Sequence, residues 1–177
     1  AVSLVKFNSN ENEVVIPSKV STLKDHAFEE CVKITKLTIP ASVKNVEDYV
    51  FAACRDLAEI DLQNDKLGDH MFDNGYENGA LVNLTIPSTI LDVDSYAFAN
   101  NLNLENVTIE NKVIGPYEFY NCPKLKKIRV PDDFEEIGEG AFGATGLEEI
   151  WIPFVGHHAF TENSSESLLG YIFGTDN

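Results

Sequence analysis

The sequence predicts an α/β fold, a right-handed solenoid in which each unit of 21–24 residues contributes one strand to a parallel sheet. A short helical or 3₁₀ turn is expected on the opposite face of each unit. Two observations carry this prediction: a strand-like motif that recurs along the chain, and a phenylalanine motif that follows it. One unit of this length cannot bury its apolar side chains alone, but stacked units bury them in one continuous core.

The first motif reads aliphatic-x-x-aliphatic-x-aliphatic. Because alternate residues of a strand point to opposite faces, Leu37 and Ile39 are expected inside the solenoid and Thr38 outside. A proline follows the motif in most copies, where it removes a backbone donor and ends the strand. The six full copies begin at Ile34, Leu57, Leu81, Leu104, Leu125 and Leu147, and a shorter copy, EVVIP, begins at Glu13.

The second motif places a phenylalanine after a turn, as in DHAF or SYAF. An Asp or Ser before x-A-F is typical of the N-cap of a short helical or 3₁₀ turn. Each phenylalanine is expected to fill the core between the strand and the opposite wall. The seven copies place it at Phe28, Phe51, Phe72, Phe98, Phe119, Phe142 and Phe160.

Some copies depart from the common length. The segments Gln63–Phe72 and Glu110–Phe119 lack the proline and are two residues shorter than the others, so tighter turns are expected there. The segment DNGYENGA after Phe72 is rich in Asn and Gly and is expected to form an outward loop. The last copy, Pro153–Phe160, is the shortest.

The ends of a solenoid need covering. The apolar stretches SLVKF and EVVIP flank NSNEN and predict a β-hairpin cap over residues 1–16, before the repeats at 17–160. The remaining residues, 161–177, contain LLGYIFG, which either folds back as a C-terminal cap or begins a further module. The whole chain, 1–177, is treated as one domain.

These motifs resemble those of the BspA-like subclass of leucine-rich repeat proteins, from about Glu13 to Phe160. The strand followed by "IP" and the "AF-x-x-C" turn carry the resemblance. The subclass occurs in surface proteins of anaerobic and gut bacteria and of some protist parasites. The resemblance implies an extracellular or cell-surface location and binding of a protein ligand, such as a host matrix or host cell-surface protein.

The composition argues against several classes of partner. A net charge of −16 disfavours nucleic acid and acidic membrane surfaces, which bind clustered Lys and Arg. No apolar run reaches the roughly 18–20 residues of a membrane span, so no membrane insertion is expected. The opening AVSLVKF lacks signal-peptide features, which fits a cytosolic protein and equally a trimmed secreted fragment. We expect a monomer.

The histidines occupy a position of the repeat. His26, His70 and His158 lie two residues before a repeat phenylalanine, where other copies have tyrosine or Gly140. This regularity argues against catalysis, and the neighbours His157 and His158 lack the converging third and fourth ligands of a zinc site. We therefore expect neither an enzyme nor a metal or other cofactor.

The cysteines also share one position. Cys31, Cys54 and Cys122 each follow a repeat phenylalanine by three residues and are expected to be small buried side chains. A Cys31–Cys54 bridge between adjacent units is disfavoured by their parallel side-chain directions. The acidic stretch DDFEEIGEG lacks the alternating ligands of a calcium loop and is expected to be a solvated face.

The outward strand positions form the candidate binding surface. In a solenoid they line up on the concave sheet, where such proteins bind partners. Arg129 and Trp151 are expected to be neighbours, and both residue types are enriched in binding hot spots. The alternatives are that the tail covers Trp151, or that it stacks on Arg129 for stability. The predicted ligand-binding residues are Thr38, Asp61, Thr85, Thr108, Lys127, Arg129, Glu149 and Trp151.

Three functions remain to be compared. The first is a non-catalytic interaction or adhesion module that binds through the concave sheet. The second is a structural spacer in a larger wall-anchored surface protein, with no ligand of its own. The third is an enzyme, which the motifs disfavour, since the chain has neither a phosphate-binding loop nor a G-x-S-x-G elbow.

Overall fold

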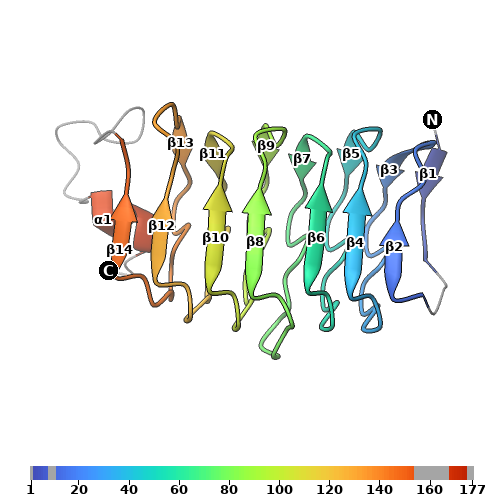
Figure 1. Cartoon of the computed structure of the whole chain (residues 1–177), viewed down its shortest axis with the longest axis horizontal. Coiled ribbons are helices and arrows are strands. Elements are labelled where there is room, and N and C mark those ends of the chain that lie inside the picture. Colours follow the sequence, from blue (N-terminus) through green and yellow to red (C-terminus); the bar gives the residue numbers. More distant parts are fainter. Residues whose placement is uncertain (1, 8–10, 154–167, 175–177) are drawn as a thin grey trace.

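The structure is a computed structural model that describes residues 2–7, 11–153 and 168–174. It is a solenoid whose coils stack along one long axis, with two rows of parallel strands (Figure 1). The front row consists of β2 (Glu13–Val15), β4 (Lys36–Ile39), β6 (Glu59–Leu62), β8 (Asn83–Ile86), β10 (Asn106–Ile109), β12 (Lys127–Arg129) and β14 (Glu149–Trp151). The back row consists of β1 (Val2–Leu4), β3 (Val20–Leu23), β5 (Asn45–Val46), β7 (Lys66–Leu67), β9 (Asp92–Val93), β11 (Val113–Ile114) and β13 (Glu136–Ile137).

The front row confirms the predicted strands. Equivalent residues of paired strands lie opposite one another, so that Leu37 pairs with Ile60 and Thr38 with Asp61. Leu37 and Ile39 are fully buried, whereas Thr38 between them is partly exposed. The alternation predicted from the sequence therefore sets which side chains enter the core.

The repeat phenylalanines form a continuous stack inside the solenoid. The rings of Phe28 and Phe51 lie 4.6 Å apart, and those of Phe119 and Phe142 lie 6.0 Å apart at the other end. All six described members of the predicted set are at most 3% exposed. The seventh, Phe160, lies outside the described residues.

Helical turns opposite the front row are not confirmed. The one helix of the described residues is α1 (Leu168–Phe173), near the C-terminus, and it is not long and apolar enough to cross a membrane. The residue two before each phenylalanine has a left-handed backbone, with φ of 56° at His26 and 55° at Tyr49, which interrupts any helical run. The turns instead bond to the next coil, as when the Phe28 N–H donates to the Val50 carbonyl at 2.8 Å.

The prediction of an N-terminal hairpin is also wrong. β1 pairs in parallel with β3, and β2 pairs in parallel with β4, so the two strands belong to different rows. The Phe7 ring stacks 4.7 Å from Phe28, and its N–H donates to the Ala27 carbonyl at 2.8 Å. Residues 2–7 thus form part of another coil, because Phe7 buries its ring on the phenylalanine stack.

The C-terminal segment folds back onto the last coil. The Gly140 N–H donates to the Tyr171 carbonyl at 2.8 Å, and the Phe142 N–H donates to the Ile172 carbonyl at 2.9 Å. Ile172 is fully buried, and the Phe173 ring lies 6.5 Å from Phe142. Of the two alternatives for LLGYIFG, the cap is the one that these contacts support.

Candidate functional site

The structure places the predicted outward residues on the front row. Thr85 lies opposite Thr108 on β8 and β10, and Arg129 lies opposite Trp151 on β12 and β14. Apart from the partly exposed Thr38, the predicted binding residues are exposed to solvent. The geometry of the predicted row is therefore correct, and its role in binding stays a prediction.

The front row is interrupted between β6 and β8 and again where β10 meets β12. β10 and β12 are neighbours (Figure 1), but they belong to separate hydrogen-bonded sheets, β8–β10 and β12–β14. A surface depression of about 740 Å³, here called the groove, lies at this second interruption. It is lined by residues 105–108 from β10 and the residue before it, by residues 123, 124 and 126–129, and by Trp151.

Basic side chains dominate the lining of the groove. Lys124, Lys126, Lys127 and Arg129 line it, and Glu105 is the acidic residue among its lining. The groove thus holds four of the chain's 13 basic residues, although the net charge of the chain is −16. A local excess of positive charge on an acidic protein concentrates anionic ligands at that place.

The three lysines already face glutamates. Lys126 lies 3.3 Å from Glu148, and Lys124 lies 3.8 Å from Glu105. Lys127 pairs with Glu149 across the β12–β14 strand pair. Ion pairs this exposed contribute little to stability, so a ligand carboxylate can replace a glutamate at small cost.

Arg129 and Trp151 are both accessible to a ligand in the groove. Arg129 makes no ion pair with any described residue, and no cation–π contact joins it to Trp151 in the described part of the chain. Trp151 is 48% exposed. Of the two alternatives for Trp151, stacking on Arg129 is therefore not what the structure shows, and half of the indole surface faces solvent.

Sequence reasoning identified Thr108, Lys127, Arg129 and Trp151 of the groove but missed Lys124 and Lys126. These two lysines precede the strand, so the alternation of outward positions does not include them. Their signal was the clustering itself, four basic residues between positions 124 and 129.

The histidine position forms a second aromatic stack, at a corner of the coil. The rings of His26, Tyr49, His70, Tyr96 and Tyr117 follow one another at centroid distances of 4.6–5.3 Å and interplanar angles of 6–8°. This arrangement confirms that His26 and His70 fill a repeat position. Stacked rings at this spacing contribute about 0.5–1.5 kcal/mol per pair, which offsets the strained left-handed backbone that carries them.

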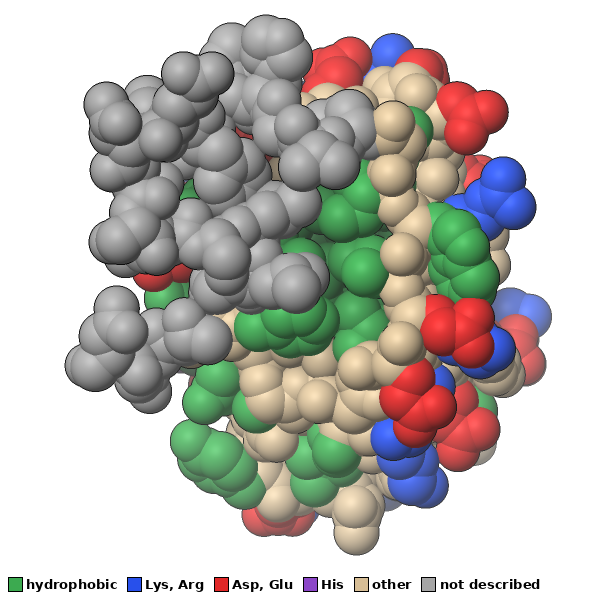
Figure 2. Space-filling view, turned by 90° about the vertical axis from the view of Figure 1, so that its left-hand side faces the viewer, with side chains coloured by type: hydrophobic (Ala, Val, Ile, Leu, Met, Phe, Trp, Pro, Cys, Tyr) green, Lys and Arg blue, Asp and Glu red, His purple; other side chains and the backbone are tan. Residues whose placement is uncertain are grey.

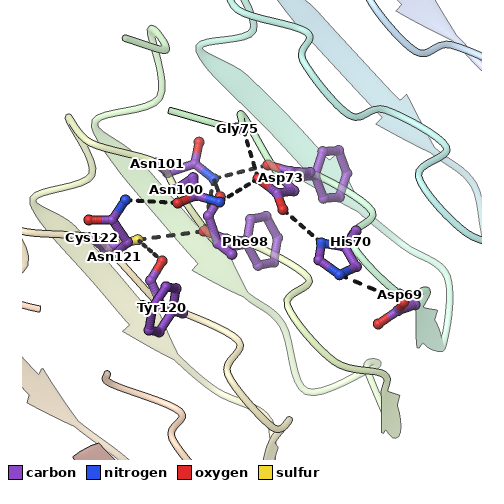
Figure 3. A network of polar contacts seen from close by, with 12 residues as sticks. Asp69, His70, Asp73, Gly75, Phe98, Asn100, Asn101, Tyr120, Asn121 and Cys122 are labelled. Carbon is purple, nitrogen blue, oxygen red and sulfur yellow. Dashed lines mark hydrogen bonds and ion pairs between the residues drawn. The ribbon is translucent and has the colours of Figure 1, made fainter. Parts of the chain in front are cut away.

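His70 is also held at its edge (Figure 3). Its Nδ1 lies 2.7 Å from a carboxylate oxygen of Asp73, and its Nε2 lies 3.9 Å from Asp69. The other Asp73 oxygen accepts from the Gly75 N–H and from Asn100 Nδ2. Both ring faces and Nδ1 are therefore engaged in structural contacts. His157 and His158 lie outside the described residues.

The cysteine position carries a hydrogen-bond donor rather than a plain apolar side chain. The Cys54 thiol donates to the Phe28 carbonyl at 3.2 Å, and Asn101 at the same position donates Nδ2 to the Phe72 carbonyl at 3.0 Å. The cysteines are free, and burial raises the pKa of Cys54 and of Cys122 to about 12. Both thiols remain protonated at neutral pH, which makes them poor nucleophiles there.

Glu118 is a buried carboxyl that sequence reasoning missed. It occupies the position just before Phe119, where the other coils have Ala27, Val50, Met71, Ala97 and Ala141. One oxygen accepts the Gly115 N–H at 2.8 Å, and the other has no hydrogen-bond partner in the part of the chain that the structure describes. Burial raises the pKa of Glu118 to about 8, so the group is largely protonated at neutral pH. In the described residues, no cluster of three His, Cys, Asp or Glu side chains is arranged to hold a metal ion.

One strand per coil in the front row, a phenylalanine stack and an open outward face define a protein of the leucine-rich repeat class. The chain belongs to the family of the BspA type leucine-rich repeat region, which matches it in six copies over residues 6–78 and 67–167. No curated protein sequence matches the chain.

Solved structures of bacterial proteins share the fold. The pneumococcal vaccine antigen PcpA is similar with a TM-score of 0.67 and 22% identity, over 84% of this chain and 42% of that one. A leucine-rich repeat protein of T. pallidum is similar with a TM-score of 0.53 and 23% identity, over 85% of this chain and 63% of that protein. A leucine rich cell surface protein of Faecalibacterium prausnitzii is similar with a TM-score of 0.58 and 20% identity, over 99% of this chain and 38% of that protein. The chain thus spans less than two thirds of each of these proteins, and identities this low indicate a common fold alone.

Proposed function

We propose that the chain is a non-catalytic protein-interaction module of a bacterial cell-surface or secreted protein, and that it binds its partner through the groove. The observation that carries this proposal is the groove itself, in which exposed Trp151 and Arg129, which has no ion-pair partner among the described residues, lie at a break in the front row. Tryptophan and arginine are the residue types that most often dominate binding energy at protein interfaces.

The family and its structural relatives support the location. The chain belongs to the BspA type leucine-rich repeat family, and one similar structure is that of a protein described as a cell surface protein. A solenoid presents an extended outer surface for partners without needing an enclosed active site. Host matrix and host cell-surface proteins are the partners proposed for this surface.

The test is direct binding to a panel of purified host matrix and host cell-surface proteins. We expect Trp151→Ala and Arg129→Ala each to weaken a detected interaction at least about tenfold, as hot-spot truncations do. Val15→Ala is the matched control, because Val15 holds the same outward strand position on β2, far along the row from the groove. Binding that survives both groove substitutions would place the interface elsewhere.

The spacer function remains the second candidate. It is favoured by the small outward side chains of the middle coils, where Thr38, Thr85 and Thr108 recur at one strand position. A panel in which no protein binds would support this alternative. Binding that requires Trp151 would exclude it.

A further inference from the structure

We propose that the groove recognises an extended acidic peptide segment that carries a large apolar side chain. This inference rests on the proposed function and names the chemistry of the partner at the same site. It follows from the charge of the groove, the state of Arg129 and the apolar part of the lining.

Charge selects an acidic ligand. The lining combines Lys124, Lys126, Lys127 and Arg129 with a single carboxylate, Glu105, on a chain of net charge −16. An acidic segment is attracted by the basic lining residues, which outnumber the neighbouring Glu105, Glu148 and Glu149, and is disfavoured by the net negative charge of the chain, so its encounter is steered towards the groove. The selectivity comes from the contrast between the groove and the rest of the chain.

Arg129 provides the specific contact. Its guanidinium has no carboxylate partner among the described residues, so its planar set of N–H donors is available for a ligand carboxylate. Such pairs are frequently bidentate and stronger than contacts between neutral groups. The neighbouring lysines add positive charge but no fixed contact geometry. Each lysine can release its exposed glutamate and pair with a carboxylate of the ligand instead.

The apolar lining favours a peptide over a plain polyanion. Val107, Pro123 and Trp151 line the groove beside the basic residues. The exposed half of Trp151 gains by covering an apolar side chain, at about 25 cal/mol per Å² of apolar surface removed from water. An uncharged or purely anionic ligand would use only one of these two features.

The C-terminal end of the solenoid shows the same mixture. Viewed onto this end, apolar side chains gather at its middle and charged side chains lie along one edge (Figure 2). Leu147, Ile150 and Ile152 are only partly buried here, whereas Ile128, one coil earlier, is 1% exposed. Trp151 is the outward residue of the same strand, β14, on which Ile150 is only partly buried.

The chain offers a matched control for charge. Lys36 on β4 and Lys127 on β12 begin their strands and pair with Glu59 and Glu149 on the next strand. Lys127 lines the groove and Lys36 does not. A specific site responds to Lys127→Gln alone, whereas general attraction to surface charge responds equally to Lys36→Gln.

The experiment follows the fluorescence of Trp151, the only tryptophan of the chain. The titrant is a synthetic 12-residue peptide of glutamates around a central leucine pair, and its counterpart has glutamine in place of glutamate. We expect a saturable change in emission with the acidic peptide, which weakens as salt is raised, and at least roughly tenfold weaker binding of the glutamine peptide. Arg129→Gln and Lys127→Gln should weaken binding about five- to tenfold, and Lys36→Gln should leave it unchanged.

Three outcomes would overturn the inference. They are equal binding of the two peptides, equal weakening by Lys36→Gln and Lys127→Gln, and a response to heparin oligosaccharide without a response to the peptide. Thermal melts of each variant confirm that the fold is retained. The proposed function is judged separately: a protein partner lost in Trp151→Ala but not displaced by the acidic peptide preserves the function and removes this inference.

Discussion

The core and the front row of this solenoid follow opposite rules. Inside, coil after coil places the same ring at the same point, and Phe28, Phe51 and Phe98 differ little in burial. Outside, one strand position holds Val15 at one end of the row and Trp151 at the other. The strand backbone that carries Val15 is nearly the same as the one that carries Trp151. The repeated inner side chains therefore maintain the stack, and the varied outer side chains are free to differ in function.

The largest effect is expected from breaking the core. Phe98→Ala removes a fully buried ring that stacks on Phe72 at 5.0 Å and on Phe119 at 6.1 Å. Truncations of this kind cost about 3–5 kcal/mol. Urea unfolding measures the loss, with Tyr76→Ala as the control because Tyr76 is 83% exposed on its loop. Equal effects of the two substitutions would contradict the distinction between core and surface.

The next largest effect on stability is expected from Glu118, the buried carboxyl inside the core. Burial raises the folded-state pKa of Glu118 to about 8, above its ordinary value of 4.5, so the folded protein binds this proton more tightly than the unfolded chain. The stabilisation is complete below about pH 4.5 and is lost as pH rises through about 8. Glu118→Gln should remove this loss, on the order of a few kcal/mol in full, and melting curves from pH 5 to 9 measure it. Parallel pH profiles for the two proteins would show that Glu118 does not carry the effect.

A smaller effect is expected at the Cys and Asn position. Asn101→Ala removes the donor to the Phe72 and Phe98 carbonyls, and it leaves buried Asn74 without its acceptor. An unsatisfied buried polar group costs about 1–3 kcal/mol. Asn101→Cys should recover part of this loss, because Cys122 makes the equivalent bond to the Phe98 carbonyl in the next coil. Chemical unfolding ranks the three proteins, and a cysteine variant no better than alanine would contradict the shared role.

Comparing coils with one another explains which parts were predictable. The strands and the phenylalanine stack could be predicted from the spacing, because an apolar position that recurs in every unit is a core position in every unit. The helical turns did not, since D-x-A-F resembles an N-cap, whereas the left-handed backbone at His26 and Tyr49 depends on bonding to the next coil. Tertiary contacts here override local preference.

The shortened coils show the same limit. Tighter turns were expected in Gln63–Phe72 and Glu110–Phe119, and the structure has Asn64 and Asn111 buried inside them. Asn111 Nδ2 donates to the Val113 carbonyl at 2.6 Å, and Asn64 makes the equivalent bond to Lys66. Length was visible in the sequence, but the buried amide was not. The groove could not be predicted from the sequence either, because no residue pattern shows that β10 and β12 do not pair.

The smallest effect on stability is expected where the effect on binding is largest. Arg129 has no ion-pair partner among the described residues, so Arg129→Ala should change the free energy of unfolding by no more than about 0.5 kcal/mol. Trp151→Ala also removes the buried half of the indole and should cost about 1 kcal/mol, well below the cost of Phe98→Ala. Unfolding curves test this directly, followed by circular dichroism because the variant lacks the tryptophan signal. A loss comparable to that of Phe98→Ala would mean that Trp151 maintains the end of the stack. A loss this small, together with weakened binding, would separate an outer surface that recognises a partner from an inner stack that only supports it.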